Sequence, residues 1–160
     1  MDKPTLFVFV GIPGSGKTTH AIKMAKEKGL DHHSTDVIRT QLNPNLEPKE
    51  AQRKTWNTFY YRIYRSLENG RSCIADATNL SIKERAGYFK RYSELANIVA
   101  VHIDTPPELC IERNENRKNA EKLKKGEHYV PEEVVLRYID KLVVPTKEEG
   151  FAEVITVKGY

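Results

Sequence analysis

The sequence contains 160 residues, of which 39% are hydrophobic and 30% are charged, and this balance is typical of a globular protein with one domain over residues 1–160. No apolar run is long enough to cross a bilayer and no stretch has the pattern of a secretory leader, so we expect a cytoplasmic protein without a membrane partner. The net charge of +4 is mildly basic and allows an anionic partner without requiring one. The two cysteines, Cys73 and Cys110, form no spaced framework, which favours a reducing compartment.

Strands and helices are expected to alternate along the chain. Apolar, β-rich runs predict strands at residues 5–10, 30–34, 72–76, 98–103 and 154–157. Apolar residues at helical spacing predict helices at 18–28, 49–68, 81–96 and 107–117, and a last helix that begins near residue 131. This alternation predicts an α/β fold with a doubly wound, five-stranded parallel sheet, helices on both faces, and ligands at the carboxyl ends of the strands.

Residues 11–18 have the sequence Gly-Ile-Pro-Gly-Ser-Gly-Lys-Thr and match the phosphate-binding P-loop, G-x-x-x-x-G-K-[ST]. An apolar strand precedes the loop and a helix follows it, so backbone N–H groups and the helix dipole are expected to point at an anion. Lys17 is expected to reach the β- and γ-phosphates of ATP, and Thr18 to ligate Mg²⁺. The predicted nucleotide-binding set is Gly11, Pro13, Gly14, Ser15, Gly16, Lys17, Thr18 and Thr19.

Two charged residues follow the predicted strand at 30–34. Asp36 lies at the edge where ligands bind, and its carboxylate can accept a proton from an attacking hydroxyl group. Arg39 comes one helical turn later and can hold an anionic group of the acceptor. The alternative is a helix whose N-cap is Asp36, with Arg39 in solvent. The position after a P-loop favours the functional interpretation.

Asp76 ends the apolar strand at 72–76 and resembles a Walker B carboxylate, which can hold Mg²⁺ or orient groups of the active site. The alternative is a carboxylate that caps the loop at 77–79. We favour the functional interpretation, because an apolar strand that ends in Asp is the pattern of a Walker B element.

Arg113, Arg117 and the segment after them are the third candidate group. Between Arg113 and His128 there are six Lys and Arg residues against three Glu, without an apolar pattern. Because the segment lacks an apolar pattern, we expect a mobile lid over about residues 113–130. Arginine offers a planar donor fork for a developing phosphoryl charge, and Arg117 is the better catalytic candidate. The alternative is an ordinary solvated helix face.

The helix predicted at 49–68 carries an apolar and aromatic stripe at helical spacing. Its members are Trp56, Phe59, Tyr60, Ile63, Tyr64 and Leu67. We interpret the stripe as core rather than as a platform on which bases stack. The histidines show no metal-ligand spacing.

Four motifs together resemble the kinase domain of 5′-hydroxyl polynucleotide kinases. They are Gly-x4-Gly-Lys-Thr at 11–18, Ser-Thr-Asp-Val-Ile-Arg at 34–39, Ile-Ala-Asp-Ala-Thr-Asn at 74–79 and Arg-Asn-x-x-Arg at 113–117. The tail at 144–157 is similar to the wider group of small P-loop kinases, so the resemblance covers nearly the whole chain.

The resemblance implies a P-loop kinase-like fold with a small lid and a role for each motif residue. Asp36 would be the general base on the 5′-hydroxyl group, Arg39 would contact the acceptor phosphate, and Asp76 would lie beside Arg39 and help to position it. Lys17 and Arg117 would stabilise the transferring phosphoryl group. The set expected to bind substrate is Asp36, Arg39, Asp76, Asn79 and Arg113.

The leading hypothesis is therefore an ATP- and Mg²⁺-dependent kinase that transfers the γ-phosphoryl group to a hydroxyl group, with the 5′ end of a nucleic acid as the favoured acceptor. A kinase for a nucleoside, sugar or antibiotic is the first alternative, and an NTP-binding regulatory module is the second. The motifs leave open the choice between DNA and RNA, the choice between ATP and GTP, and the oligomeric state.

Overall fold

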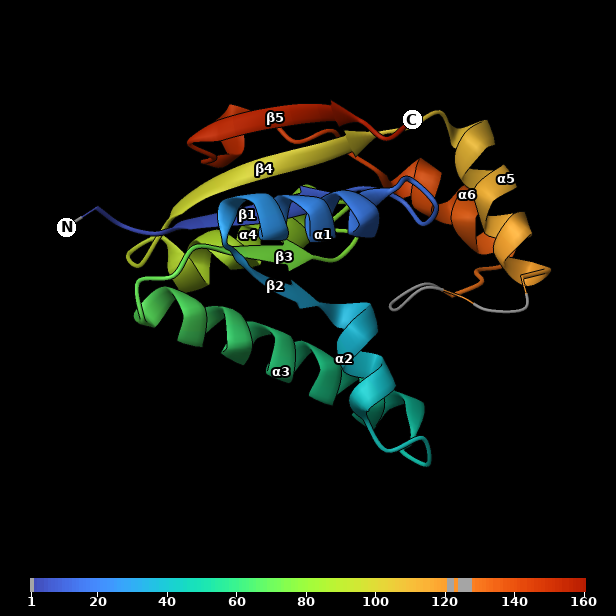
Figure 1. Ribbon diagram of the computed structural model, residues 1–160, viewed down its shortest axis with the longest axis horizontal. Helices are drawn as coiled ribbons and strands as arrows, with labels where there is room; N and C mark the ends of the chain where they lie inside the picture. The colour runs from blue at the N-terminus through green and yellow to red at the C-terminus, as the bar shows by residue number, and fades with distance from the viewer. Residues whose placement is uncertain (1, 121–122, 124–127) are drawn as a thin grey trace.

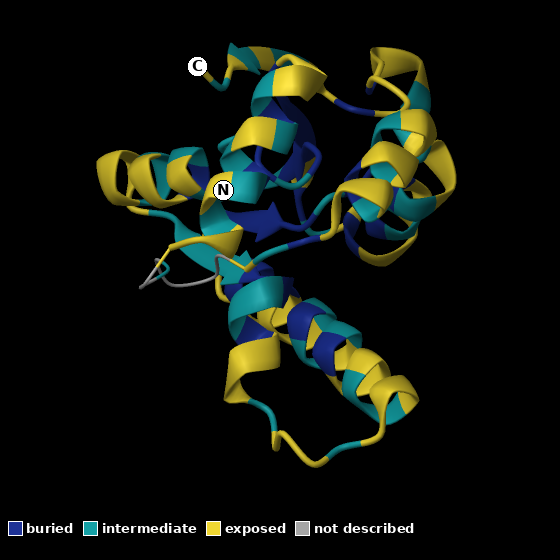
Figure 2. Ribbon diagram, turned by 90° about the vertical axis from the view of Figure 1, so that its right-hand side faces the viewer, coloured by how far each residue is buried: buried dark blue, intermediate teal, exposed yellow. Residues whose placement is uncertain are grey.

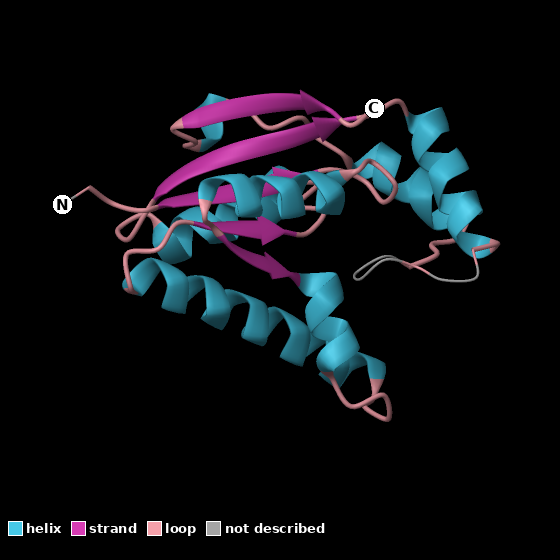
Figure 3. Ribbon diagram, in the orientation of Figure 1, coloured by secondary structure: helices cyan, strands magenta, loops and turns pink. Residues whose placement is uncertain are grey.

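The computed structural model describes residues 2–120, 123 and 128–160. Within them, five strands form one parallel sheet in the order β2-β3-β1-β4-β5 (Figures 1 and 3). The strands are β1 (Thr5–Val10), β2 (Asp31–Ser34), β3 (Cys73–Asp76), β4 (Asn97–Asp104) and β5 (Glu153–Lys158). The predicted doubly wound parallel sheet is confirmed, and each strand lies within one or two residues of its predicted position.

The described helices are α1 (Lys17–Lys28), α2 (Thr35–Gln41), α3 (Pro48–Glu68), α4 (Ile82–Tyr92), α5 (Pro107–Lys118) and α6 (Glu132–Lys141), with a short 3₁₀ turn η1 (Lys147–Glu149). Two of them differ from the prediction. The short helix α2 was not among the predicted helices, and α4 ends at Tyr92 because residues 93–96 turn back, with Ala96 N–H donating to the carbonyl of Tyr92. The other helices are confirmed to within one or two residues.

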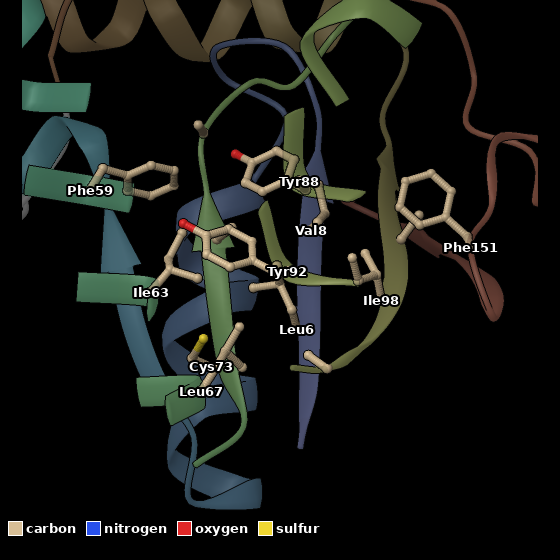
Figure 4. Packing of buried hydrophobic residues seen from close by; sticks show 14 of the residues in the cluster. Leu6, Val8, Phe59, Ile63, Leu67, Cys73, Tyr88, Tyr92, Ile98 and Phe151 are labelled. Carbon is tan, nitrogen blue, oxygen red and sulfur yellow. The ribbon is translucent and has the colours of Figure 1, made fainter. Parts of the chain in front are cut away.

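The alternation of side chains along β1 explains why both faces of the sheet are covered. Leu6 and Val8 belong to the larger core cluster, which α3 and α4 complete, and Figure 4 shows Phe59 and Tyr88 packed over it. Phe9 points to the opposite face, where α1 closes a smaller cluster. Successive residues of a strand face opposite sides, so one apolar strand supplies both layers of the core.

The stripe on α3 is confirmed as core for three of its six members and differs for the rest. Phe59, Ile63 and Leu67 are buried, whereas Trp56 and Tyr60 are partly buried and Tyr64 is 41% exposed. In Figure 2 the turns at the start of α3 are largely exposed, whereas the strands β1, β3 and β4 are mostly buried. Trp56 and Tyr60 therefore pack at the edge of the core, and α3 also contacts α2.

All five strand arrows point toward the side of the molecule where α2, α5 and α6 lie (Figure 1). Figure 2 looks onto this side. The carboxyl ends of the strands and the N-terminus of α1 therefore meet between two flanking groups of helices, which is the place predicted for ligands. In the part of the chain that the structure describes, no helix is long and apolar enough to span a membrane.

A buried ion pair fixes the loop after β3. Arg85 of α4 is fully buried, donates to both carboxylate oxygens of Glu149 at 2.9 Å, and also donates to the carbonyls of Asn79 and Leu80. Burial would raise the pKa of Glu149, but the hydrogen bonds from Arg85 outweigh it and hold that pKa below its usual value.

We expect Arg85→Ala to lower the free energy of unfolding by about 3 kcal/mol, because it leaves the Glu149 carboxylate buried without its partner. Urea unfolding measures the change. Arg53→Ala is the control: its ion pair with Glu50 is exposed, with a nitrogen–oxygen distance of 3.8 Å, and we expect a loss below about 1 kcal/mol. Equal losses in the two variants would contradict the role given to Arg85.

Candidate active site

The P-loop connects β1 to α1 and folds as the motif predicts. Gly11 N–H donates to the carbonyl of Thr78 at 3.1 Å, and this bond places the loop beside the end of β3. Gly14 has a φ of 83°, and a Cβ atom there would lie 2.5 Å from the carbonyl oxygen of Cys110. Only glycine fits this left-handed, crowded position. The loop therefore keeps its shape through close backbone contacts.

The side chains of Thr105 and Arg113 support the P-loop from the side opposite the cavity. Thr105 Oγ1 donates to the carbonyl of Ser15 at 2.6 Å. The two guanidinium nitrogens of Arg113 donate to the carbonyls of Gly14 at 3.2 Å and Gly159 at 2.7 Å. Arg113 is not among the residues that line the cavity in front of the loop, so the structure gives it the support of the loop in place of the predicted substrate contact.

Asp76 lies directly under the P-loop and is 2% exposed. Its carboxylate accepts hydrogen bonds from Lys17 Nζ at 3.0 Å and Thr18 Oγ1 at 3.1 Å, and it contacts His32 Nε2 at 2.8 Å. Burial would raise the pKa of Asp76, but the Lys17 ammonium group and the His32 hydrogen bond outweigh it and hold the pKa at about 2. Asp76 is therefore an anion that fixes the P-loop lysine.

The oxygen atoms at this point fit Mg²⁺ better than a softer metal. Thr18 and Asp76 supply a hydroxyl group and a carboxylate, and Mg²⁺ binds few protein oxygens and completes its shell with water and phosphate. Among the described residues, no group of three or more His, Cys, Asp or Glu side chains could hold a metal ion. Ser15 Oγ is buried in the loop without a hydrogen-bond partner there, which also fits a loop that receives an anion.

The pair of Asp36 and Arg39 lies on α2, across from the P-loop. Ser34, not Asp36, caps this helix, because its Oγ atom accepts a hydrogen bond from Val37 N–H. The Asp36 side chain is thus available to face the cavity. Arg39 donates to Asp36 Oδ1 at 2.7 Å and to Gln52 Oε1 at 3.5 Å.

Two predicted contacts of the acceptor site are not formed. Asp76 binds Lys17, Thr18 and His32, as given above, and no described contact links it to Arg39, so the prediction that it positions Arg39 is wrong. Asn79 is 3% exposed; its amide donates to the carbonyl of Phe9 at 2.8 Å and accepts from the hydroxyl group of Tyr88. Asn79 therefore holds the turn after β3 and does not line the cavity.

One cavity of about 560 Å³ joins these groups. Lys17, Thr18, Asp36, Arg39 and Arg117 all lie in its wall, so the structure brings together the P-loop and the predicted acceptor residues. The lining also includes side chains that the sequence analysis did not assign to the site: Gln52, Trp56, His128 and Tyr138. Much of the predicted lid lies outside the described residues, at 121–122 and 124–127.

The arrangement defines a P-loop kinase-like protein. The family model described as "AAA domain" matches residues 6–145, so the chain belongs to this family. Among curated proteins, none matches the sequence significantly.

Solved structures support the fold. The chain is 25% identical to a chain of the Pnkp1/Rnl/Hen1 RNA repair complex, with a TM-score of 0.75, and the match covers 89% of this chain and 45% of that chain. It is 16% identical to Kti12 of Chaetomium thermophilum, solved with ADP-AlF3, with a TM-score of 0.72 and coverage of 96% and 88%. A sugar kinase from Janibacter is 19% identical, with a TM-score of 0.65 and coverage of 99% and 86%. The resemblance to polynucleotide kinases and small P-loop kinases is thereby confirmed.

The chain spans less than half the length of its match in the RNA repair complex.

Proposed function

We propose that the protein is an ATP- and Mg²⁺-dependent kinase that transfers the γ-phosphoryl group to the 5′-hydroxyl group of a nucleic acid. The observation that carries the proposal is the shared cavity, which has the P-loop lysine Lys17 in its wall together with the carboxylate–guanidinium pair of Asp36 and Arg39. A regulatory NTP-binding module does not need a carboxylate that faces a second substrate.

In this reaction the acceptor oxygen attacks the γ-phosphorus, the bond to the β–γ bridging oxygen breaks, and ADP leaves. Asp36 accepts the proton of the attacking hydroxyl group. Lys17 and Arg117 stabilise the negative charge on the transferring group, since both side chains line the cavity. Thr18 and Asp76 would hold Mg²⁺, which would neutralise charge at the phosphates.

Two observations favour a nucleic acid as the acceptor. Arg39 lines the cavity beside Asp36, and a planar guanidinium group suits the phosphate that follows a 5′-terminal nucleoside. The solved structure of the RNA repair complex supports the same choice. The similarity to a sugar kinase keeps a small-molecule acceptor as the second candidate, but at 19% identity it speaks for the fold alone.

If Arg39 binds this phosphate, the acceptor needs a 3′-phosphate to be a good substrate. We expect a nucleoside to have a kcat/KM about ten- to a hundredfold lower than its 3′-monophosphate, since one charge-assisted contact of about 1.5–3 kcal/mol is lost. Arg39→Ala should remove most of this preference and leave the affinity for ATP unchanged. The preference is measured as transfer of labelled γ-phosphate to four acceptors. They are a nucleoside, its 3′-monophosphate, a short 5′-hydroxyl oligonucleotide and gluconate, which represents a small-molecule acceptor.

Arg62→Ala is the matched control, because Arg62 donates to Gln41 on the same pair of helices but does not line the cavity. This variant should keep the preference of the unmodified protein. A nucleoside or gluconate that matches the 3′-phosphorylated acceptor would refute the nucleic-acid proposal and put the small-molecule kinase first.

A further inference from the structure

Trp56 lines the cavity that also has Asp36 and Arg39 in its wall. It lies on α3 one helical turn after Gln52, and residues four apart on a helix are neighbours on one face. Gln52 accepts a hydrogen bond from Arg39, so Trp56 lies one helical turn from the residue that contacts the group that we assign to the acceptor phosphate. Both Gln52 and Trp56 line the cavity.

The indole ring is held rigidly. It packs edge-on against Phe59, with ring centroids 5.5 Å apart, and at 35° to the ring of Tyr60, with centroids 5.6 Å apart. Tyr60 is itself covered by the guanidinium group of Arg91, 3.8 Å from its centroid. Because one side of the ring rests on the core, little conformational entropy is lost when a flat ligand binds its cavity side.

We propose that Trp56 is the platform on which the base of the acceptor's 5′-terminal nucleotide stacks. This inference rests on the proposed function and names the part of the acceptor that the cavity recognises. A nucleotide carries a base and a phosphate on one sugar, and the wall of the cavity contains an aromatic ring, Trp56, and a guanidinium group, Arg39. Stacking accepts every base, so Trp56 favours nucleotides over sugars without selecting a sequence.

Trp56 is the single tryptophan of the chain, so its fluorescence reports on this position in the unmodified protein. The full chain is first saturated with Mg²⁺ and a non-hydrolysable ATP analogue. A short 5′-hydroxyl oligonucleotide is then added stepwise, and tryptophan fluorescence is excited at a wavelength that the bases do not absorb. We expect quenching by this oligonucleotide and by a nucleoside 3′-monophosphate, and no quenching by an oligonucleotide whose 5′-terminal residue is abasic or by gluconate.

Kinetics of two variants give an independent measurement. For the unmodified protein, we expect kcat/KM to be about ten- to a hundredfold higher for the base-bearing than for the abasic acceptor. Trp56→Leu should remove this ratio and Trp56→Phe should keep most of it. A general loss of folding lowers both rates and leaves the ratio unchanged. Tyr61→Leu is the control, because Tyr61 lies on the same helix but is 58% exposed and does not line the cavity.

The outcomes separate this inference from the function on which it rests. Rapid phosphorylation of both acceptors, with a ratio near one, would refute stacking and leave the kinase assignment intact. Quenching by the ATP analogue alone would also refute it, because Trp56 would then belong to the donor site. If no nucleic acid is phosphorylated while gluconate is, the proposed function fails, and the inference fails with it.

Discussion

Replacing Lys17 with alanine is expected to abolish phosphoryl transfer, with a loss of at least about 10³-fold in kcat. The Lys17 side chain is 9% exposed and lies in the wall of the cavity, so solvent screens its charge little. Lys17 Nζ donates to Asp76 at 3.0 Å, which keeps the ammonium group at the loop rather than in solvent. Single-turnover transfer of labelled γ-phosphate measures the loss.

The control for this prediction is Lys28→Ala. Lys28 lies at the other end of α1 and is exposed, so its removal changes the net charge equally but leaves the cavity intact. Thermal unfolding of both variants shows whether the loss of activity follows from a loss of structure. A Lys17→Ala protein that is folded and turns over near the native rate would remove Lys17 from the mechanism.

The sheet and the P-loop could be predicted from the sequence because their signals are local. An apolar strand, a glycine-rich loop and a helix occur within residues 5–28, and the backbone geometry of Gly14 follows directly from the motif. The helix α2 was harder to predict, because its seven residues contain too few turns for an apolar period. The sequence feature that indicates α2 is Ser34, a residue type that favours the N-cap position of a helix.

The roles of Arg113 and Asn79 could not be predicted, because long-range contacts decide them. Arg113 donates to Gly14, 99 residues away, and Asn79 donates to Phe9, 70 residues away. Both residues stand in motifs that resemble an active site, and both complete backbone hydrogen bonds that otherwise remain unmade in a buried place. The motif thus includes residues that hold the site as well as residues that face it.

Trp56 has the sequence pattern of a core residue but lines the cavity. Helical spacing places it on the same stripe as Phe59 and Ile63, so its sequence pattern is that of a core residue. Since α3 extends past the sheet, the stripe continues beyond the core and its first aromatic residue reaches the cavity. Where a helix leaves the core depends on tertiary packing, and no local pattern encodes it.

Asp36→Asn should lower kcat by about 10²- to 10⁴-fold and change the affinity for ATP little, because it preserves the shape of the side chain but removes the proton acceptor. Steady-state kinetics on a 5′-hydroxyl oligonucleotide measure kcat, and the nucleotide analogue titration measures affinity. Asp140→Asn is the control, since Asp140 is an exposed carboxylate on α6.

The ion pair with Arg39 offers a second explanation for such a loss, and the acceptor series separates the two. If Asp36 acts only by holding Arg39, its removal weakens binding of the acceptor phosphate. The rate with a nucleoside, which has no such phosphate, should then stay unchanged. If Asp36 is the base, the nucleoside and its 3′-monophosphate lose the same factor in kcat. A double-mutant cycle with Arg39→Ala tests this further, since a base keeps most of its effect when Arg39 is absent. A loss confined to phosphorylated acceptors would make Asp36 a positioning residue and leave the proton to another group.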